Sequence, residues 1–527
     1  MKSKLTSYQK IVLILTCATL ASISFDYFGF TIALPDIGKE FDLGTSQIGW
    51  IMNASQLSFA ASIIGIGRFA DMIGRTRLMI GGCVVFGIAA AMTASADGLG
   101  MLIAGRAING LSNAMIAVTG LSVLTHVFDR HLRSFAIGFL TASSLGAGIF
   151  APFAAGAVTQ YLSWRWFFLM DGILATVCFV LLLVFLREPQ DAKKSERFDF
   201  VGFLMMASGI VLFIYSLDAA DKLGWQSATV IGGLAGGIAL LIGLYFAERW
   251  VKDPLIHFTL FKDRDFLGGC LVIFFTQVPG GALMMFLTLY LQHVLGLSPV
   301  MTGLVFLASM VPGTTISLFS GSFHDKMGNR VTLGLASALL ALCFVTFGFY
   351  KPGNSIVFIL VGLALYGLGQ TIAATTTSAV VMAAAPAEKS GQAAGLLKSI
   401  RAIGATFGVA CAGVLFRTSE QVRLSHLYDL AGSRLTQTQQ SEIRSLLSGS
   451  DAAREKLRQI APDLNERVHL VISDAYAHAF RDVMFFFVAC AAIAFLSIFI
   501  VRGQQLPDEK ADSDEPDVLP QKVEEKT

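Results

Sequence analysis

The chain has 527 residues, of which 54% are hydrophobic and only 14% are charged. A soluble core cannot cover that much apolar surface, so the composition excludes an ordinary water-soluble domain and favours a membrane protein. The net charge of +2 gives no reason to expect a nucleic-acid partner. The seven cysteines are scattered singly through apolar segments, without zinc or disulfide spacing. We therefore expect no metal ion and no cofactor.

Fourteen apolar stretches of about 18–26 residues are each long enough to cross a bilayer as a helix. They fall near residues 11–34, 47–66, 78–96, 100–125, 135–160, 165–186, 200–217, 228–247, 266–291, 300–320, 331–349, 355–382, 391–416 and 482–501. The first stretch is too long for the core of a signal peptide, so we expect it to remain as a membrane span. The predicted fold class is an all-α membrane protein.

The distribution of Lys and Arg predicts the orientation of the chain. With a cytoplasmic N-terminus, sixteen of these residues fall on inner loops and only four on short outer loops. The positive-inside rule then places both termini in the cytoplasm. The basic segment 418–481 falls outside, but it is too long for the rule to apply.

A charged turn between two apolar stretches, Gly67–Arg77, recurs as Gly321–Arg330, 254 residues later. Each turn follows a stretch that carries a glycine 18 residues earlier, Gly49 and Gly303. An internal repeat in a membrane protein is typical of a transporter in which one half moves against the other.

Charged, proline-containing connectors divide the chain further. The predicted segments are an N-terminal six-helix bundle at 1–197, two inserted helices at 198–250, five helices of a C-terminal bundle at 251–417, a polar extracytoplasmic loop at 418–481, a last membrane helix at 482–502 and an acidic, disordered cytoplasmic tail at 503–527. Apolar residues at helical spacing predict a short helical cap within the polar loop. The loop could act as a lid, as a surface for a partner, or have no role in transport.

Asp26 and Arg106 lie deep within apolar stretches. Asp26 is 15 residues into the first stretch, which puts it roughly 22 Å from the cytoplasmic end. A charge at the membrane centre costs about 2.5–3.5 kcal/mol on insertion scales, so such a residue is a candidate for function. We predict that Asp26 binds and releases a proton and that Arg106 controls its charge. The alternative for each is a structural hydrogen bond between helices.

Asp171 and Lys398 are two further charges in apolar stretches, on opposite halves of the chain. They could line a central cavity and select a charged ligand, or pair with each other across it. For Lys398, which is about 7 residues into its stretch, the alternative is snorkelling to the cytoplasmic surface.

These features resemble the Major Facilitator Superfamily, and within it the fourteen-helix drug:proton antiporters that include bacterial multidrug efflux pumps. The matching residues are Asp26 with Ala33-Leu34-Pro35, the turn residues Gly67, Asp71, Gly74 and Arg75, the segment Arg106–Gly110, the helix motif with Gly148, Pro152 and Gly156, Trp164-Arg165-Trp166, and Arg401 with Gly404. The chain departs from the pattern in two glycines of the 148–156 motif, which are alanine here. Asp171 and Lys398 likewise stand where asparagine is commoner.

The resemblance implies two six-helix bundles with two inserted helices between them. It also implies that the turn with Asp71, and its weaker equivalent at Asp325, holds the cytoplasmic side closed in the outward-facing state. The alternative for these charges is a topogenic role only. Asn109, Asp171, Lys398 and Arg401 are the candidate substrate residues.

The chain contains no phosphate-binding loop and no hydrolase motif, so we expect a transporter driven by an ion gradient and not an enzyme. The predicted function is export of small amphipathic or apolar compounds, including drugs, across the inner membrane in exchange for protons. Alternatives are transport of a single endogenous solute, such as a siderophore or a lipid-like metabolite, and a non-transporting receptor or scaffold.

The expected partners are the substrate, protons and the bilayer. A periplasmic adaptor is considered as well, and the protein is otherwise expected to be a monomer.

Overall fold

The computed structural model describes residues 6–128, 130–186, 199–251, 256–317, 320–350, 354–386, 390–430 and 465–502. Within these ranges the chain forms fourteen α-helices and no β-strand. The helices are α1 Ser7–Glu40, α2 Thr45–Ile73, α3 Arg75–Ala94, α4 Leu99–Val127, α5 Arg130–Tyr161, α6 Trp164–Phe185, α7 Phe200–Leu223, α8 Ala228–Ala247, α9 Arg264–Leu289, α10 Pro299–Ser317, α11 Ser320–Gly348, α12 Val357–Ala384, α13 Ser390–Leu430 and α16 Asn465–Ser497. The prediction of an all-α protein with fourteen long helices is confirmed.

Thirteen of these helices are long and apolar enough to span a bilayer, and α2 is the exception. Helix α2 has 29 residues, which is ample length, but it carries buried polar side chains such as Asn53 and Ser55. Its polarity is therefore directed into the protein and does not face lipid. Large apolar side chains are exposed instead on peripheral helices, including Leu183 at 61% and Val184 at 67% on α6. Such a band of exposed apolar surface fits a bilayer and not water.

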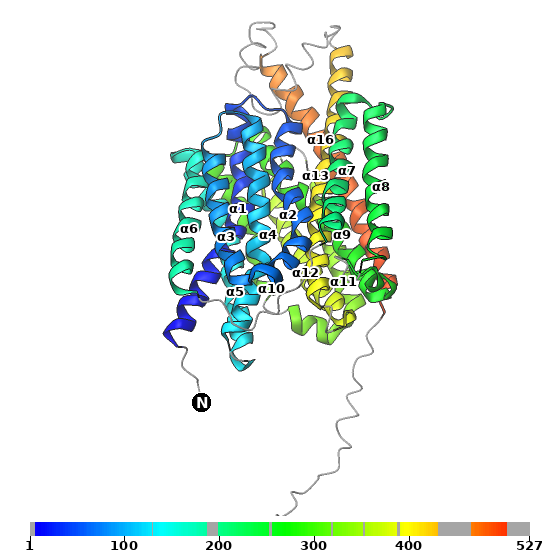
Figure 1. The fold of residues 1–527 in the computed structure, drawn as a ribbon. Coiled ribbons are helices and arrows are strands. Elements are labelled where there is room, and N and C mark those ends of the chain that lie inside the picture. Colours follow the sequence, from blue (N-terminus) through cyan, green and yellow to red (C-terminus); the bar gives the residue numbers. More distant parts are fainter. Residues whose placement is uncertain are drawn as a thin grey trace, which may run out of the picture.

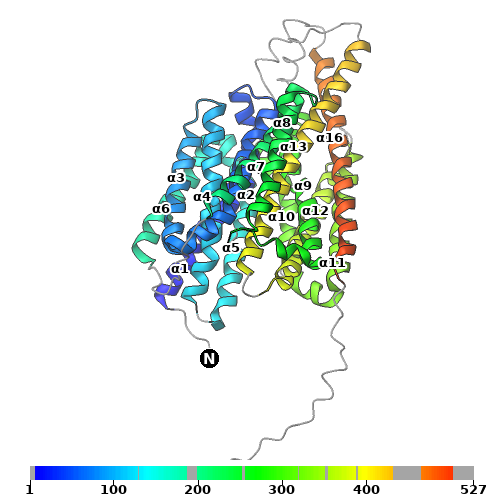
Figure 2. The ribbon, with the colours of Figure 1, turned by 45° about the vertical axis from the view of Figure 1, so that its right-hand side comes forward.

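The helices run side by side along one long axis and form two groups, α1–α6 and α9–α16 (Figure 1). The groups meet mainly where α2 packs on α13 and where α5 packs on α10. The inserted pair α7–α8 lies beside this seam, because α7 packs on both α2 and α13 (Figure 2). The start of α1 and the end of α16 lie at the same end of the bundle (Figure 1).

The internal repeat is present in the backbone as well as in the sequence. Gly74 separates α2 from α3 with φ of 102°, and Gly328 interrupts α11 with φ of 75°. The two glycines are 254 residues apart, the same offset as the two charged turns. A positive φ of this kind favours glycine over every residue that has a Cβ, so each half changes direction at an equivalent glycine.

Helices α13 and α16 are longer than the apolar stretches that predicted them. Helix α13 continues to Leu430 and α16 begins at Asn465, so both ends of the segment 418–481, predicted as a polar loop, are helical. Arg423 and Asp474 form an ion pair at 3.3 Å between the two extensions. Hydropathy ends where the bilayer ends, but polar helix continues beyond it, and this explains the difference. Residues 431–464 and the predicted tail at 503–527 lie outside the described part of the chain.

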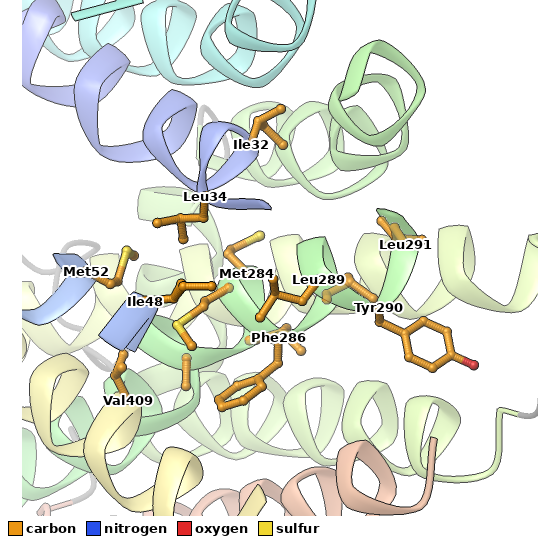
Figure 3. Packing of buried hydrophobic residues seen from close by; sticks show 14 of the residues in the cluster. Ile32, Leu34, Ile48, Met52, Met284, Phe286, Leu289, Tyr290, Leu291 and Val409 are labelled. Carbon is orange, nitrogen blue, oxygen red and sulfur yellow. The ribbon is translucent and has the colours of Figure 1, made fainter. Parts of the chain in front are cut away.

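An apolar seal closes the seam between the two halves at the end away from the start of α1. It consists of Ile32, Leu34, Ile48, Met52, Met284, Met285 and Val409, which belong to one buried cluster (Figure 3). Leu34 and Ile48 are 0% exposed and Met285 is 1% exposed. Hydrogen bonds also cross the seam here, from Gln292 Nε2 to the Ile32 carbonyl at 3.3 Å. The halves are thus in dry contact at this end.

Candidate functional site

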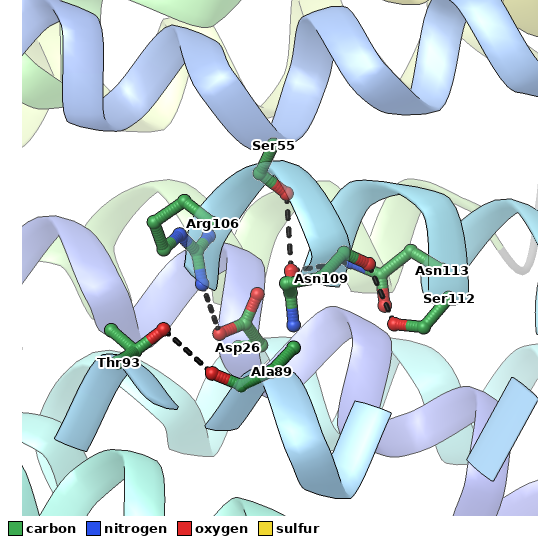
Figure 4. A network of polar contacts seen from close by, with 8 residues as sticks. All are labelled: Asp26, Ser55, Ala89, Thr93, Arg106, Asn109, Ser112 and Asn113. Atoms are coloured by element: carbon green, nitrogen blue, oxygen red, sulfur yellow. Dashed lines mark hydrogen bonds and ion pairs between the residues drawn. The ribbon is translucent and has the colours of Figure 1, made fainter. Parts of the chain in front are cut away.

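Asp26 of α1 and Arg106 of α4 form a buried ion pair (Figure 4). Arg106 Nη1 donates to Asp26 Oδ1 at 2.7 Å, and the side chains are 4% and 2% exposed. The Arg106 guanidinium also lies over the Phe30 ring, 4.2 Å from its centroid. An arginine in an aromatic setting retains a favourable electrostatic contact on its face while its edge binds the carboxylate.

The hydrogen bonding of this pair is incomplete. Asp26 Oδ2 and Arg106 Nε are buried and have no hydrogen-bond partner. A buried ion pair offsets its desolvation cost only when its remaining donors and acceptors are satisfied. The pair therefore costs stability, which is the property expected of charges that are kept for function rather than for folding.

Asp171 of α6 lies in the same electrostatic environment as this pair. Its side chain is 3% exposed, and neither carboxyl oxygen has a hydrogen-bond partner. It interacts electrostatically with both Asp26 and Arg106. The structure thus brings together two carboxyl groups and one guanidinium from α1, α4 and α6, which we call the charge cluster. The pairing considered between Asp171 and Lys398 is not formed, because the two residues have different neighbours.

Asn109 lies one turn from Arg106 on α4 but belongs to a packing network. Its Oδ1 accepts hydrogen bonds from Ser55 Oγ at 3.1 Å and from Asn113 Nδ2 at 3.0 Å (Figure 4). The side chain is 3% exposed. Next to it, a Cβ on Gly110 would overlap the Ser55 carbonyl oxygen. The structure therefore places Asn109 in the α2–α4 contact, and not in a position open to a substrate.

The motif on α5 lies where that helix meets α10 of the other half. A Cβ on Gly156 would come within 2.5 Å of the Pro299 carbonyl oxygen, and one on Gly148 within 3.1 Å of the Phe28 ring. Pro152 presents its carbonyl oxygen to Gly303 of α10. These residues allow the two backbones to approach closely, and none of them contacts the charge cluster.

The two charged turns lie at the opposite end from the apolar seal. Gly67 is within α2, close to Val118 of α4, and Gly74 separates α2 from Arg75, the first residue of α3. The side chains of Asp71 and Asp325 lie outside the described residues. The proposed closing contact at these turns therefore stays a prediction.

Lys398 and Arg401 of α13 lie at the seam between the halves. Lys398 Nζ donates to the Ala117 carbonyl oxygen of α4, in the other half, at 3.3 Å. Arg401 interacts electrostatically with Tyr27 of α1, whose side chain is hydrogen-bonded to Gln56 of α2. Sequence reasoning did not single out Tyr27 or Gln56. The only signal for Tyr27 is its position beside Asp26, and uncharged polar residues within a span are common.

Among the described residues no group of three or more His, Cys, Asp or Glu side chains is placed to hold a metal ion. The arrangement is instead two helical halves joined along a seam, with a charge cluster buried in one half. This combination defines a polytopic membrane transporter.

Comparison with known families agrees with this class. The family model described as Major Facilitator Superfamily matches residues 14–409, and the chain belongs to this superfamily. Membership makes the protein a transporter and not an enzyme.

Several relatives that the chain resembles are named as efflux, export or drug-resistance proteins. The chain is 29% identical over 414 residues to a multidrug resistance protein Stp of Mycobacterium tuberculosis (strain CDC 1551 / Oshkosh). This match covers 77% of this chain and 75% of the relative. It is 28% identical over 414 residues to the cephamycin export protein CmcT of Amycolatopsis lactamdurans, covering 77% of this chain and 84% of the relative. The chain is 26% identical over 412 residues to a riboflavin transporter RibZ of Clostridioides difficile (strain 630). This match covers 78% of this chain and 88% of the relative.

Solved structures show the same fold. A bacterial homologue of the human lysosomal transporter Spinster, in an inward-facing and occupied conformation, superposes with a TM-score of 0.66. The match covers 94% of this chain and 97% of that chain at 15% sequence identity. At this identity the likeness concerns the fold alone.

Proposed function

We propose that this transporter exports small amphipathic organic compounds across the inner membrane of a bacterial-type cell in exchange for protons. The observation that carries the proposal is the charge cluster of Asp26, Arg106 and Asp171. The cephamycin export protein among the relatives supports the direction of transport. Both termini are proposed to be cytoplasmic, so the apolar seal is proposed to face the outside.

The charge balance of the cluster provides the reason to expect proton binding. With both carboxyl groups ionised, the cluster carries two negative charges and one positive charge. An uncompensated charge in a dry interior is costly, so the cluster is expected to take up one proton. Binding one proton makes it neutral without removing the Asp26–Arg106 ion pair.

Helix α1 provides a path by which proton binding can affect the seal. Asp26 and Phe30 lie one turn apart on α1, and Ile32 and Leu34 of the same helix belong to the seal. Because a helix moves as a unit, a change in the attraction between Asp26 and Arg106 shifts the residues that hold the halves together. We propose that protonation favours one state of the seam and proton release the other.

The direct test uses inverted membrane vesicles that carry an imposed proton gradient. Lumenal pH is followed while cationic, neutral and anionic compounds are added. We expect compound-dependent proton release from the wild type, and none from Asp26→Asn or Asp171→Asn, because either change leaves a cluster that is neutral without a proton. Asp26→Glu, at equal expression, retains the carboxyl group and is the matched control. Equal release from wild type and both Asn variants would contradict the proposed site.

Transport of a single endogenous solute is the second candidate function. The riboflavin transporter among the relatives favours it, as do the alanines in the α5 motif. Uptake of radiolabelled flavin by vesicles, with no response to the drug panel, would support this alternative.

The protein is proposed to act as a monomer, and the extensions of α13 and α16 are where a periplasmic adaptor would bind.

A further inference from the structure

Two cationic side chains lie together at the seam. Lys398 and Arg401 are three residues apart on α13, so they project from the same face of the helix. They interact electrostatically with each other. Like charges at this spacing repel, so the helix carries an unfavourable contact unless a negative charge lies between them.

Polar side chains from both halves surround this pair of cations. Tyr27 of α1 interacts with Arg401 and also with Tyr366 of α12. The Tyr366 hydroxyl is hydrogen-bonded to the Gly280 carbonyl oxygen of α9 at 3.5 Å. Together with the bond from Lys398 to α4, these contacts place the cations where the two halves face each other, which is where transporters of this architecture hold their cargo.

Neither cation has a negatively charged partner within the described part of the chain. Lys398 donates its hydrogen bond to a neutral backbone carbonyl, and Arg401 Nε is buried with no hydrogen-bond partner. The contrast with Arg106 is direct, because Arg106 has two carboxyl groups beside it. The cluster in the N-terminal half has an excess of negative charge, and the pair on α13 has an excess of positive charge.

We infer that Lys398 and Arg401 form an anion-binding subsite that takes the carboxylate of an amphipathic substrate. An arginine binds a carboxylate through two parallel hydrogen bonds and a lysine adds a point charge. Tyr27 and Phe28 meet edge to face with their centroids 4.9 Å apart, which provides aromatic surface beside the subsite. This inference rests on the proposed export function and specifies its substrate class as organic anions.

The test measures binding, which needs no proton gradient. The full-length protein is placed in nanodiscs of zwitterionic lipid and titrated with 2-naphthoate, 2-naphthamide and 2-naphthylmethylamine, which share one ring system. We expect the carboxylate to bind at least about 10-fold more tightly than the amide, because charge-assisted hydrogen bonds add about this factor or more. Lys398→Met is expected to reduce this preference, because only Arg401 then contacts the carboxylate, and Lys398→Arg is expected to restore it. Lys39→Met, which replaces an exposed lysine in the last turn of α1, is the matched control.

Two results would overturn the subsite. One is an amine that binds as tightly as the carboxylate, and the other is a Lys398→Met variant that keeps the full preference for the carboxylate. Because Lys398 is exposed, its replacement tests charge without disturbing buried packing. Arg401→Lys keeps the charge and loses the paired donors, so as a second variant it is expected to weaken carboxylate binding.

The outcomes for the subsite and for proton coupling are separable. Carboxylate binding without compound-dependent proton release would overturn coupling and leave the subsite in place. Proton release driven by cationic compounds, with no preference for the carboxylate, would overturn the subsite and leave coupling in place.

Discussion

Gly303 of α10 rests directly on the backbone of Pro152 in α5, so that a Cβ at position 303 would overlap the Pro152 carbonyl oxygen. The contact is reciprocal, because Gly156 of α5 faces the Pro299 carbonyl of α10 in the same way. The two helices belong to different halves, and the contact lies beside the apolar seal. Movement of one half against the other must break and re-form this contact.

Gly303→Ala is expected to open the sealed end. The added methyl group forces α5 and α10 apart, and overpacking of this kind typically costs about 1–3 kcal/mol. Since 1–2 kcal/mol corresponds to about a 5–30-fold change in an equilibrium, a cysteine introduced at Ile48 in the seal should be alkylated at least about 5-fold faster by a membrane-impermeant maleimide.

The control for this experiment is Gly146→Ala on α5, where a Cβ would meet nothing within 4 Å. Its labelling rate should equal that of the unmodified protein carrying the same cysteine. Equal rates for Gly303→Ala and the control would show that the α5–α10 contact does not hold the seal closed.

Arg106→Ala is expected to destabilise the protein strongly. Removing one partner of a buried ion pair leaves an uncompensated charge and typically costs about 3–5 kcal/mol. The double variant Asp26→Asn/Arg106→Ala removes the charge on both sides, so it should lose less stability than Arg106→Ala alone. Thermal unfolding of the purified protein in one detergent measures both. Simple additivity of the two single changes would argue that the residues do not act as a pair.

Asp171→Asn is expected to alter how stability depends on pH. If the charge cluster holds one proton in the folded state that the unfolded chain does not hold at neutral pH, stability falls as pH rises. The variant has one carboxyl and one guanidinium in the cluster, so it should lose this slope above about pH 4, where an aspartate of the unfolded chain is ionised. Parallel unfolding curves for wild type and variant across this range would mean that Asp171 does not hold the proton.

Glu40→Gln is expected to have a small effect on stability and none on coupling. The Glu40 carboxylate accepts hydrogen bonds from Arg165 at 2.5 Å and from the Trp164 indole at 2.6 Å, but it is 40% exposed. Exposed pairs of this kind contribute about 0–1 kcal/mol. A matched control is Asp482→Asn, whose pair with Arg481 at 3.6 Å is also exposed. A loss of proton release in Glu40→Gln would mean that this contact transmits movement.

The helices could be predicted from sequence because each span must satisfy its own backbone in lipid and cover itself with apolar side chains. Even α2, which is not among the thirteen helices that are clearly apolar enough to span a bilayer, was predicted from its apolar stretch at 47–66. The extensions of α13 and α16 were not predicted, because a helix in water needs no continuous cover of apolar side chains and so leaves no hydropathy signal. A polar helix beyond the bilayer has the composition of a loop.

The candidate site was predicted only in part. Asp26 and Arg106 stand out because a charge within an apolar run is costly wherever it lies. Nothing in a single sequence indicates that Asp26 and Arg106, 80 residues apart in the chain, form a pair. Nor does it indicate that Asp171 lies beside this pair, whereas Lys398 does not. Asn109 has the same polar character whether it faces a substrate or a neighbouring helix, and only packing distinguishes the two.

The amino-acid sequence by itself determined that this protein crosses a membrane many times and consists of two related halves, each with a charged turn between two helices. These properties follow from local requirements, namely hydropathy, length and backbone conformation. The tertiary structure alone decided which charges are neighbours, which glycines bring the halves into contact, and that Lys398 and Arg401 have no carboxylate partner among the described residues. Those properties depend on distances between helices, and no local rule encodes them.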